Sequence, residues 1–215
     1  MLLIQLVNKF FPAYKDARIF QKEFLLNVQN TYALVTLLYL MTQLCNCVFY
    51  EQCTNLMIFY TKFNYYIIID TLLCDPIIYF HHMIAFALMH IYTINFQLTS
   101  LSYSTGIAFG MIEISTVFLT IRAILRSYKR SHPYITMVYN INDKIFAITF
   151  FYIRIYLYYT EVLRNPEFYD IITQFTPIEY HIFNACLYLL YFLNLYWAYQ
   201  ILQAIVKPLI ARITA

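Results

Sequence analysis

Glycine is scarce in this 215-residue chain, which has only two, Gly106 and Gly110. A glycine-rich phosphate-binding loop needs several glycines at fixed spacing, and a collagen-like repeat needs one at every third position. The sequence therefore excludes both a glycine-rich nucleotide-binding fold and a collagen-like fold.

Charge is scarce as well: Asp, Glu, Lys and Arg make up 12% of the residues, against roughly 25% in a typical soluble domain. This composition excludes a soluble enzyme and a disordered regulator. The net charge is +3 and no long basic run occurs, so we predict no nucleic-acid partner.

The five cysteines include no C-x-x-C pair. We therefore predict neither a disulfide framework nor a metal site, and no resident cofactor.

Hydrophobic residues are what the chain has in abundance, at 62% of the total. A membrane-spanning helix needs about 20 apolar residues, whereas a barrel strand needs only about 9–11 that alternate with polar ones. The apolar runs are long and do not alternate, which predicts an all-α membrane protein. We expect six membrane-spanning helices, at residues 28–50, 56–74, 77–95, 101–125, 140–160 and 180–206.

The basic residues test this number of spans. If six helices alternate in direction, the N-terminal segment 1–27, the 126–139 loop and the C-terminal tail 207–215 share one face. The opposite loops contain one basic residue, Arg164. Positive charge marks the inner side of a membrane, so we expect both termini to lie inside, flanking a single transmembrane domain at 28–206. The basic residues on the inner face are Lys9, Lys15, Arg18, Lys22, Arg126, Lys129, Arg130, Lys207 and Arg212.

The formal charges inside the predicted spans include Asp70, Glu113, Arg122 and Arg154. Each costs about 2.5–3.5 kcal/mol at a lipid-exposed helix centre, so pairing within the bundle is expected. Counting depth at about 1.5 Å per residue predicts two polar layers. Asp70 lies with His81 and His82 toward the inner side, and Glu113 lies with Arg154 near the middle. Arg122 is expected near the inner surface.

The first of these layers has two interpretations. A carboxylate bound to one imidazole nitrogen makes the other nitrogen more basic, and such a histidine can act as a general base or nucleophile toward an acyl group. Alternatively, both layers are structural pairs that fix helix register. Adjacent histidines point about 100° apart on a helix and do not form an i, i+4 metal pair. Our candidate catalytic residues are His81, His82 and Asp70.

A second group of polar residues forms the candidate substrate-binding set. It consists of three of the intramembrane charges and one asparagine at the expected entrance of the fifth span, where a capping side chain is common. Asn184 and Asn194, in the sixth span, are candidates to bridge helices. The substrate-binding candidates are Glu113, Arg122, Asn140 and Arg154.

Five segments stand out by their order and spacing on a six-span chain. They are YYIIIDTLL (65–73), YFHHMIAFAL (79–88), EISTVFLTIRAIL (113–125), NINDKIFAITFFYIRI (140–155) and NLYW (194–197). Together they resemble the TLC domain of ceramide synthases, the translocating-chain-associating membrane protein and the ceroid-lipofuscinosis membrane protein. The resemblance covers roughly residues 28–206, and it implies a helical barrel around a lipid- or acyl-sized central cavity, lined by His81, His82 and Asp70.

One segment departs from the ceramide synthase pattern. Ceramide synthases carry a second motif with two aspartates, whereas residues 109–116 here read FGMIEIST, with one glutamate and no aspartate. This form resembles the smaller members of the family, which include lipid-composition regulators and transport receptors. The resemblance therefore implies lipid handling but not ceramide synthesis.

Two functions remain open at this point. The first is a protein that binds membrane lipid, or acylates it with acyl-CoA whose phosphates meet the basic inner face. The second is a non-catalytic accessory subunit of a larger membrane assembly. The resemblance favours the endoplasmic reticulum as the location, and the second function leaves the mitochondrial inner membrane open.

The G-x-x-x-G spacing of Gly106 and Gly110 predicts a helix face that packs closely against another helix.

Overall fold

The computed structural model describes residues 17–50, 61–64, 66–67, 76–95, 103–129 and 133–213. Every element in this part of the chain is a helix, and none is a strand. α6 continues directly into a π-helix, η1, and together they form one helix of 31 residues. The elements are α2 (Ala17–Tyr50), α4 (Pro76–Asn95), α5 (Tyr103–Tyr128), α6 (Pro133–Thr149), η1 (Phe150–Leu163), α7 (Pro166–Ile172) and α8 (Pro177–Ile213).

Proline occupies the first position of four of these helices, α4, α6, α7 and α8. A proline has no N–H to leave unsatisfied there, and its fixed φ angle suits the first turn. Two of these starts are also capped. The Asn165 side chain accepts a hydrogen bond from the Glu167 N–H (3.0 Å), and the Thr176 N–H donates to Glu179 Oε2 (3.1 Å) before α8. Proline and short polar side chains thus set where the helices begin.

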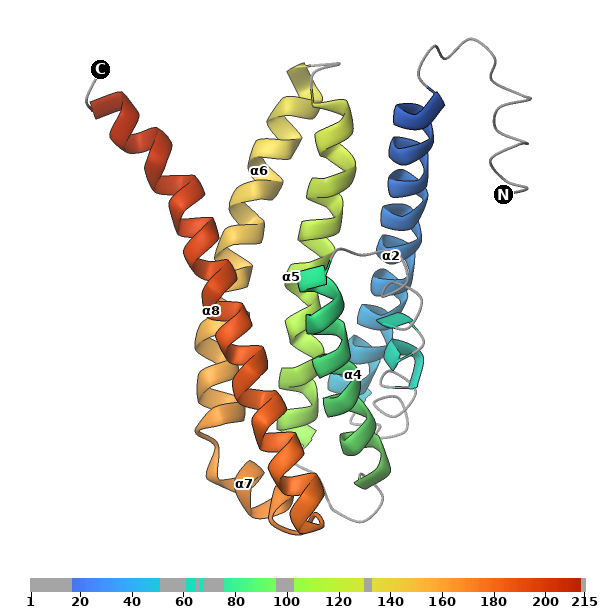
Figure 1. The fold of residues 1–215 in the computed structure, drawn as a ribbon, viewed down its shortest axis with the longest axis vertical. Coiled ribbons are helices and arrows are strands. Elements are labelled where there is room, and N and C mark those ends of the chain that lie inside the picture. Colours follow the sequence, from blue (N-terminus) through green and yellow to red (C-terminus); the bar gives the residue numbers. More distant parts are fainter. Residues whose placement is uncertain are drawn as a thin grey trace.

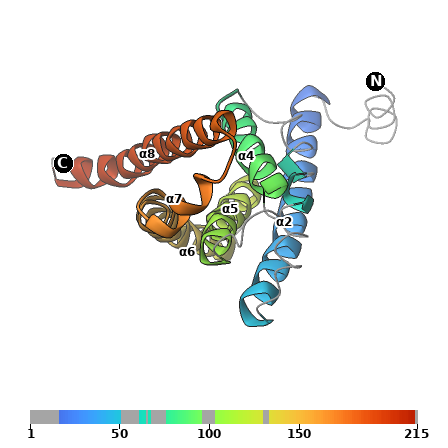
Figure 2. The same ribbon diagram turned by 90° about the horizontal axis from the view of Figure 1, so that it is seen from below.

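The long helices run along one axis and alternate in direction (Figure 1). The start of α2, the α5–α6 connection and the end of α8 lie at one end of the bundle. The connection through α7 lies at the other end (Figure 1). α5 packs against α2, α6 and η1, while α8 packs against α4 and η1 (Figure 2). α4 is shorter and begins about halfway along the bundle (Figure 1).

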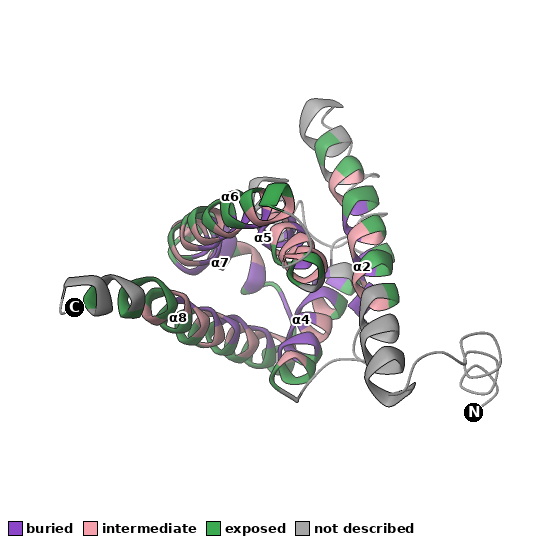
Figure 3. Ribbon diagram, turned by 90° about the horizontal axis from the view of Figure 1, so that it is seen from above, coloured by how far each residue is buried: buried purple, intermediate pink, exposed green. Residues whose placement is uncertain are grey.

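Two described helices are long and apolar enough to cross a membrane, Pro133–Leu163 and Pro177–Lys207, and Ile77–Tyr92 is a shorter apolar helix. Much of their surface is exposed (Figure 3). Many exposed side chains near the end of α8 are large and hydrophobic, as expected of a surface that faces lipid. They include Tyr199, Leu202, Ile205, Val206 and Ile210. Every described element is a helix, as predicted, whereas the number of spans and the side of the termini remain predictions.

Four of the six predicted spans fall within helices, the span 101–125 does so from Tyr103 onward, and of 56–74 only 61–64 and 66–67 are described. One boundary prediction is wrong. Asn140 was expected at a helix entrance, but α6 begins at Pro133 and Asn140 is exposed inside it. The reason is that Pro133 starts the helix two turns earlier. Two residues later, Asn142 is buried and its Nδ2 donates to the Phe118 carbonyl of α5 (2.9 Å).

The core joins α2, α4, η1 and α8 through large side chains such as Leu37, Leu88, Tyr158 and Leu187, all with at most 1% of their surface exposed. The Tyr158 hydroxyl donates to the Leu187 carbonyl (3.0 Å), so this buried phenol has the partner that burial demands. Gly110 of α5 is also buried. The core therefore holds η1 against α8, and this contact positions the polar residues described next.

Candidate functional site

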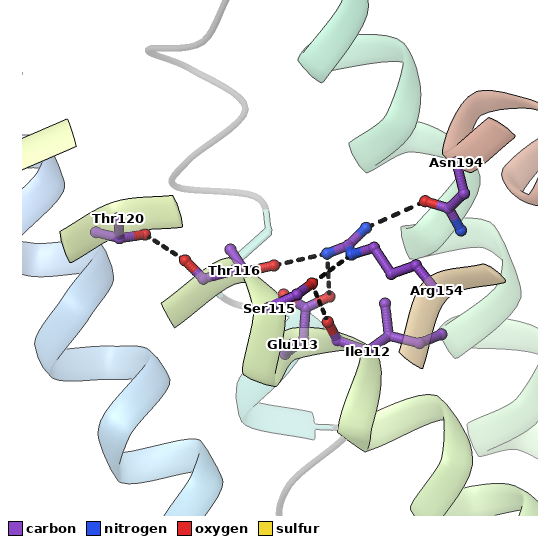
Figure 4. A network of polar contacts seen from close by, with 7 residues as sticks. All are labelled: Ile112, Glu113, Ser115, Thr116, Thr120, Arg154 and Asn194. Atoms are coloured by element: carbon purple, nitrogen blue, oxygen red, sulfur yellow. Dashed lines mark hydrogen bonds and ion pairs between the residues drawn. The ribbon is translucent and has the colours of Figure 1, made fainter. Parts of the chain in front are cut away.

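Arg154 lies at the centre of a polar network that links η1, α5 and α8 (Figure 4). Its Nε donates to Ser115 Oγ (2.7 Å), its Nη2 to Thr116 Oγ1 (2.6 Å) and its Nη1 to Asn194 Oδ1 (3.3 Å). All three guanidinium nitrogens therefore have a protein acceptor. This satisfies a requirement for any arginine buried away from water.

Glu113 balances the charge of this arginine. Its Oε1 lies 3.9 Å from Arg154 Nη2, and the side chains of Glu113 and Arg154 are only 10% and 6% exposed. The pairing of these two residues, predicted from their equal depth, is confirmed. Ser115 Oγ also donates to the Ile112 carbonyl (3.0 Å), so α5 itself orients the hydroxyl that receives Arg154.

The two histidines of α4 are buried, each with 8% of its surface exposed. The His81 ring packs edge-on against Trp197 of α8, with centroids 5.0 Å apart, and lies 5.7 Å from the His82 ring. Trp197 lies three residues after Asn194, which places both on one face of α8. Arg154 interacts electrostatically with His81. The histidines and the arginine thus belong to one region.

The prediction of two separate polar layers is wrong. That prediction assumed that the turn before Pro76 lies at the inner membrane surface, so that His81 would lie much closer to this surface than Arg154 does. Because α4 begins about halfway along the bundle (Figure 1), His81 instead lies close enough to Arg154 for an electrostatic interaction. We refer to the resulting group as the central polar cluster, which consists of His81, Glu113, Ser115, Thr116, Arg154 and Asn194.

Two buried polar atoms of the central polar cluster have no hydrogen-bond partner among the described residues. They are Asn194 Nδ2 and His81 Nδ1, carried by the facing helices α8 and α4. Asn194 is fully buried. A buried polar group without a partner is unfavourable by about 1–3 kcal/mol, so each atom favours an occupant that can form hydrogen bonds.

Sequence reasoning missed Ser115 and Thr116, although they lie only two and three residues after the glutamate that it selected. Two hydroxyls beside an intramembrane carboxylate are a signal for a buried polar partner on another helix. Asn194 was expected to bridge helices, and its hydrogen bond to Arg154 does so. Asn184 does not, because its Nδ2 donates to the Tyr180 carbonyl of its own helix (3.0 Å).

The remaining candidates lie elsewhere. Arg122 forms an ion pair with Asp143, and these side chains are 34% and 44% exposed. The Arg122 guanidinium and the Lys129 ammonium both lie near the Tyr139 ring, 5.8 and 4.3 Å from its centroid. Neither Arg122 nor the exposed Asn140 belongs to the central polar cluster. Asp70 lies outside the described residues.

Comparison with known proteins gives one match. The family model of the TLC domain matches residues 11–203, which is most of the chain. Neither a search of curated proteins nor a search of solved structures gives a match. The chain therefore belongs to the TLC-domain family, and this membership indicates a membrane protein with a lipid-related role.

Proposed function

We propose that this protein binds a membrane lipid inside its helical bundle, with the polar group of the lipid at the central polar cluster. The observation that carries this proposal is the pair of unpartnered buried atoms, Asn194 Nδ2 and His81 Nδ1. Both are carried by helices that expose many large hydrophobic side chains. A molecule with an apolar body and one hydrogen-bonding group matches this environment.

A catalytic extension of the proposal is acyl transfer from acyl-CoA to the bound lipid. His81 would remove the proton from the acceptor hydroxyl as that oxygen attacks the thioester carbonyl. The carbon–sulfur bond then breaks, and the CoA thiolate takes the proton from the imidazolium. Asp70 would orient the imidazole, and His82 is the second candidate for the base. The chemistry requires only one imidazole nitrogen that faces the lipid.

The experiment is purification of the full chain in mild detergent, followed by extraction and identification of bound lipid and an assay of acyl transfer from acyl-CoA. We expect wild type to retain lipid, and His81→Ala to lose most of it. His181→Ala is the matched control, because His181 is exposed at the start of α8. Wild-type protein without lipid would overturn the proposal. Unchanged turnover in both His81→Ala and His82→Ala would remove only the catalytic extension.

A non-catalytic accessory subunit is the second candidate, and one observation favours it. Every nitrogen of the Arg154 guanidinium is already hydrogen-bonded to α5 or α8, as expected of a group that fixes helix register. Under this hypothesis, mild purification returns a constant set of other membrane proteins and no lipid in the bundle. A fluorescent fusion would separate the endoplasmic reticulum, which fits the first function, from the mitochondrial inner membrane.

The topology belongs to the same proposal: six spans with both termini inside. The direction of the helices supports it, since α2 begins and α8 ends at the same end of the bundle (Figure 1). Three basic residues with described side chains lie toward that end, Arg126, Lys129 and Lys207. Glycosylation acceptor sites introduced near 164–176 should be modified, whereas sites added at either terminus should not.

A further inference from the structure

The charge of the central polar cluster is balanced within the protein. Arg154 and Glu113 are the only formally charged members, and they lie 3.9 Å apart in a buried environment. A phosphate group placed here would bring further negative charge next to the Glu113 carboxylate. It would also compete with Ser115 and Thr116 for the guanidinium. The electrostatics of the cluster therefore disfavour an anionic headgroup.

The unpartnered atoms define what the occupant must offer. Asn194 uses its Oδ1 as an acceptor for Arg154, so only the Nδ2 donor is left, and it needs an acceptor oxygen. His81 Nδ1 donates or accepts according to the tautomer of the ring. A hydroxyl group satisfies both atoms, because it has one O–H donor and two acceptor lone pairs. An ether oxygen has no donor, so it satisfies both atoms only in the tautomer in which His81 Nδ1 carries the proton, whereas a hydroxyl satisfies them in either tautomer.

We infer that the central polar cluster selects an uncharged lipid through a free hydroxyl, which hydrogen-bonds to Asn194 Nδ2 and His81 Nδ1. This inference rests on the proposed lipid binding and adds the chemical class of the ligand. Asn194 is then a specificity-determining residue, and Arg154 is a positioning residue that holds the amide by its oxygen. Trp197 packs against His81 and fixes the imidazole beside the hydroxyl.

Three photoactivatable probes with identical acyl chains test this inference on the full chain in phosphatidylcholine nanodiscs. They are a diacylglycerol with a free hydroxyl, its methyl ether and the corresponding phosphatidic acid. We expect the diacylglycerol to label wild type about fivefold more than either of the others, since one net hydrogen bond changes binding by about that factor. Equal labelling by all three probes, or preference for phosphatidic acid, would overturn the inference.

Asn194→Asp is the informative variant, because it keeps an oxygen for Arg154 and replaces the Nδ2 donor by a second oxygen. We expect it to lose the preference for the free hydroxyl. Asn184→Asp, on the same helix, is the matched control and should keep it. If Asn194→Asp does not fold, His81→Phe serves instead, since it keeps a ring against Trp197 and removes both nitrogens. A preference unchanged in the folded variant would refute the assignment.

The outcomes separate this inference from the proposed function. Wild-type protein can retain lipid and yet be labelled by none of the probes, or be labelled by the diacylglycerol no more strongly than by the methyl ether. Either result contradicts the hydroxyl assignment and leaves lipid binding intact. Such a result would mean that water satisfies Asn194 and His81. Wild-type protein that retains no lipid at all contradicts both.

Discussion

Two arginine–carboxylate pairs join α5 to the helix made of α6 and η1, and their surroundings are opposite. Arg122 binds Asp143 directly near the end of the bundle, where both side chains are partly exposed. Arg154 lies 3.9 Å from Glu113, and both side chains are almost fully buried. In the first pair the carboxylate is the acceptor for Nε. In the second, two hydroxyls and an amide accept the hydrogen bonds of the guanidinium.

From this difference we expect the fold to depend on the buried pair rather than on the shorter contact. When an exposed pair is broken, water solvates each partner, and such pairs contribute about 0–1 kcal/mol. When a buried pair is broken, the remaining charge has no solvent, and the loss is about 3–5 kcal/mol. Burial, rather than distance, should therefore rank the variants of this helix interface.

The largest effect is expected for Arg154→Leu. The substitution leaves the buried Glu113 carboxylate without its counter-charge and removes the donor to Ser115, Thr116 and Asn194. We expect a loss of about 3–5 kcal/mol in the free energy of unfolding. Reversible unfolding in mixed detergent micelles, followed by circular dichroism, measures it. A loss below about 1 kcal/mol would place this pair in the same class as Arg122–Asp143.

The double variant Arg154→Leu with Glu113→Leu sharpens this result. Replacing both members of a buried pair by apolar residues of similar volume is often neutral or stabilising. We therefore expect the double variant to be more stable than Arg154→Leu. If the losses of the two single variants simply add, the residues do not interact, and the pair is not what holds α5 to η1.

Some of this site could be predicted from sequence, because isolated charges in apolar runs are conspicuous. Glu113 and Arg154 stand out from their neighbours, and equal depth was enough to pair them. Ser115 and Thr116 could not be singled out in the same way. Hydroxyls in helices commonly bond to the carbonyls of their own helix, as Thr120 does to the Thr116 carbonyl (2.9 Å). Sequence alone does not show which hydroxyl also has a partner on another helix.

Depth along the bundle was the other property that sequence could not provide. Counting residues from Pro76 assumes that a turn lies at the membrane surface, but the level at which a helix begins depends on the helices packed against it. α4 packs against α8, and this contact brings His81 to Trp197 and close to Arg154. The helices themselves were predictable because apolar length and proline are local signals. The position of each helix along the bundle axis has no local signal, because it depends on contacts with other helices.

The next effect in size tests whether the buried pair needs close helix packing. Gly110 is buried one turn before Glu113 on α5, so Gly110→Leu inserts four carbons into a packed interface. We expect a loss of about 1–3 kcal/mol from overpacking, measured by the same unfolding assay. Gly110→Ala should lose less. If Gly110→Leu keeps full stability and bound lipid, the G-x-x-x-G spacing has no packing role.

A smaller effect is expected for Asn142→Ala, which tests a neutral contact across the same interface as Arg122–Asp143. Its Nδ2 donates to the Phe118 carbonyl, and its removal should lower the free energy of unfolding by about 1 kcal/mol. The matched control is Asn140→Ala, since Asn140 is exposed on the same helix. Equal losses for the two variants would show that the buried hydrogen bond of Asn142 does not determine the effect.

Arg122→Ala should have the smallest effect, although it removes the most direct ion pair described in the molecule. We expect a loss of at most about 1 kcal/mol, because water can solvate Asp143, and because Lys129 still lies against the Tyr139 ring. Salt provides the decisive control. Raising NaCl to about 1 M shortens the Debye length to about 3 Å and should remove the difference between wild type and Arg122→Ala. The difference between wild type and Arg154→Leu should persist, because no electrolyte reaches the buried pair. If Arg122→Ala and Arg154→Leu are equally destabilised and equally insensitive to salt, the two pairs do not differ through burial.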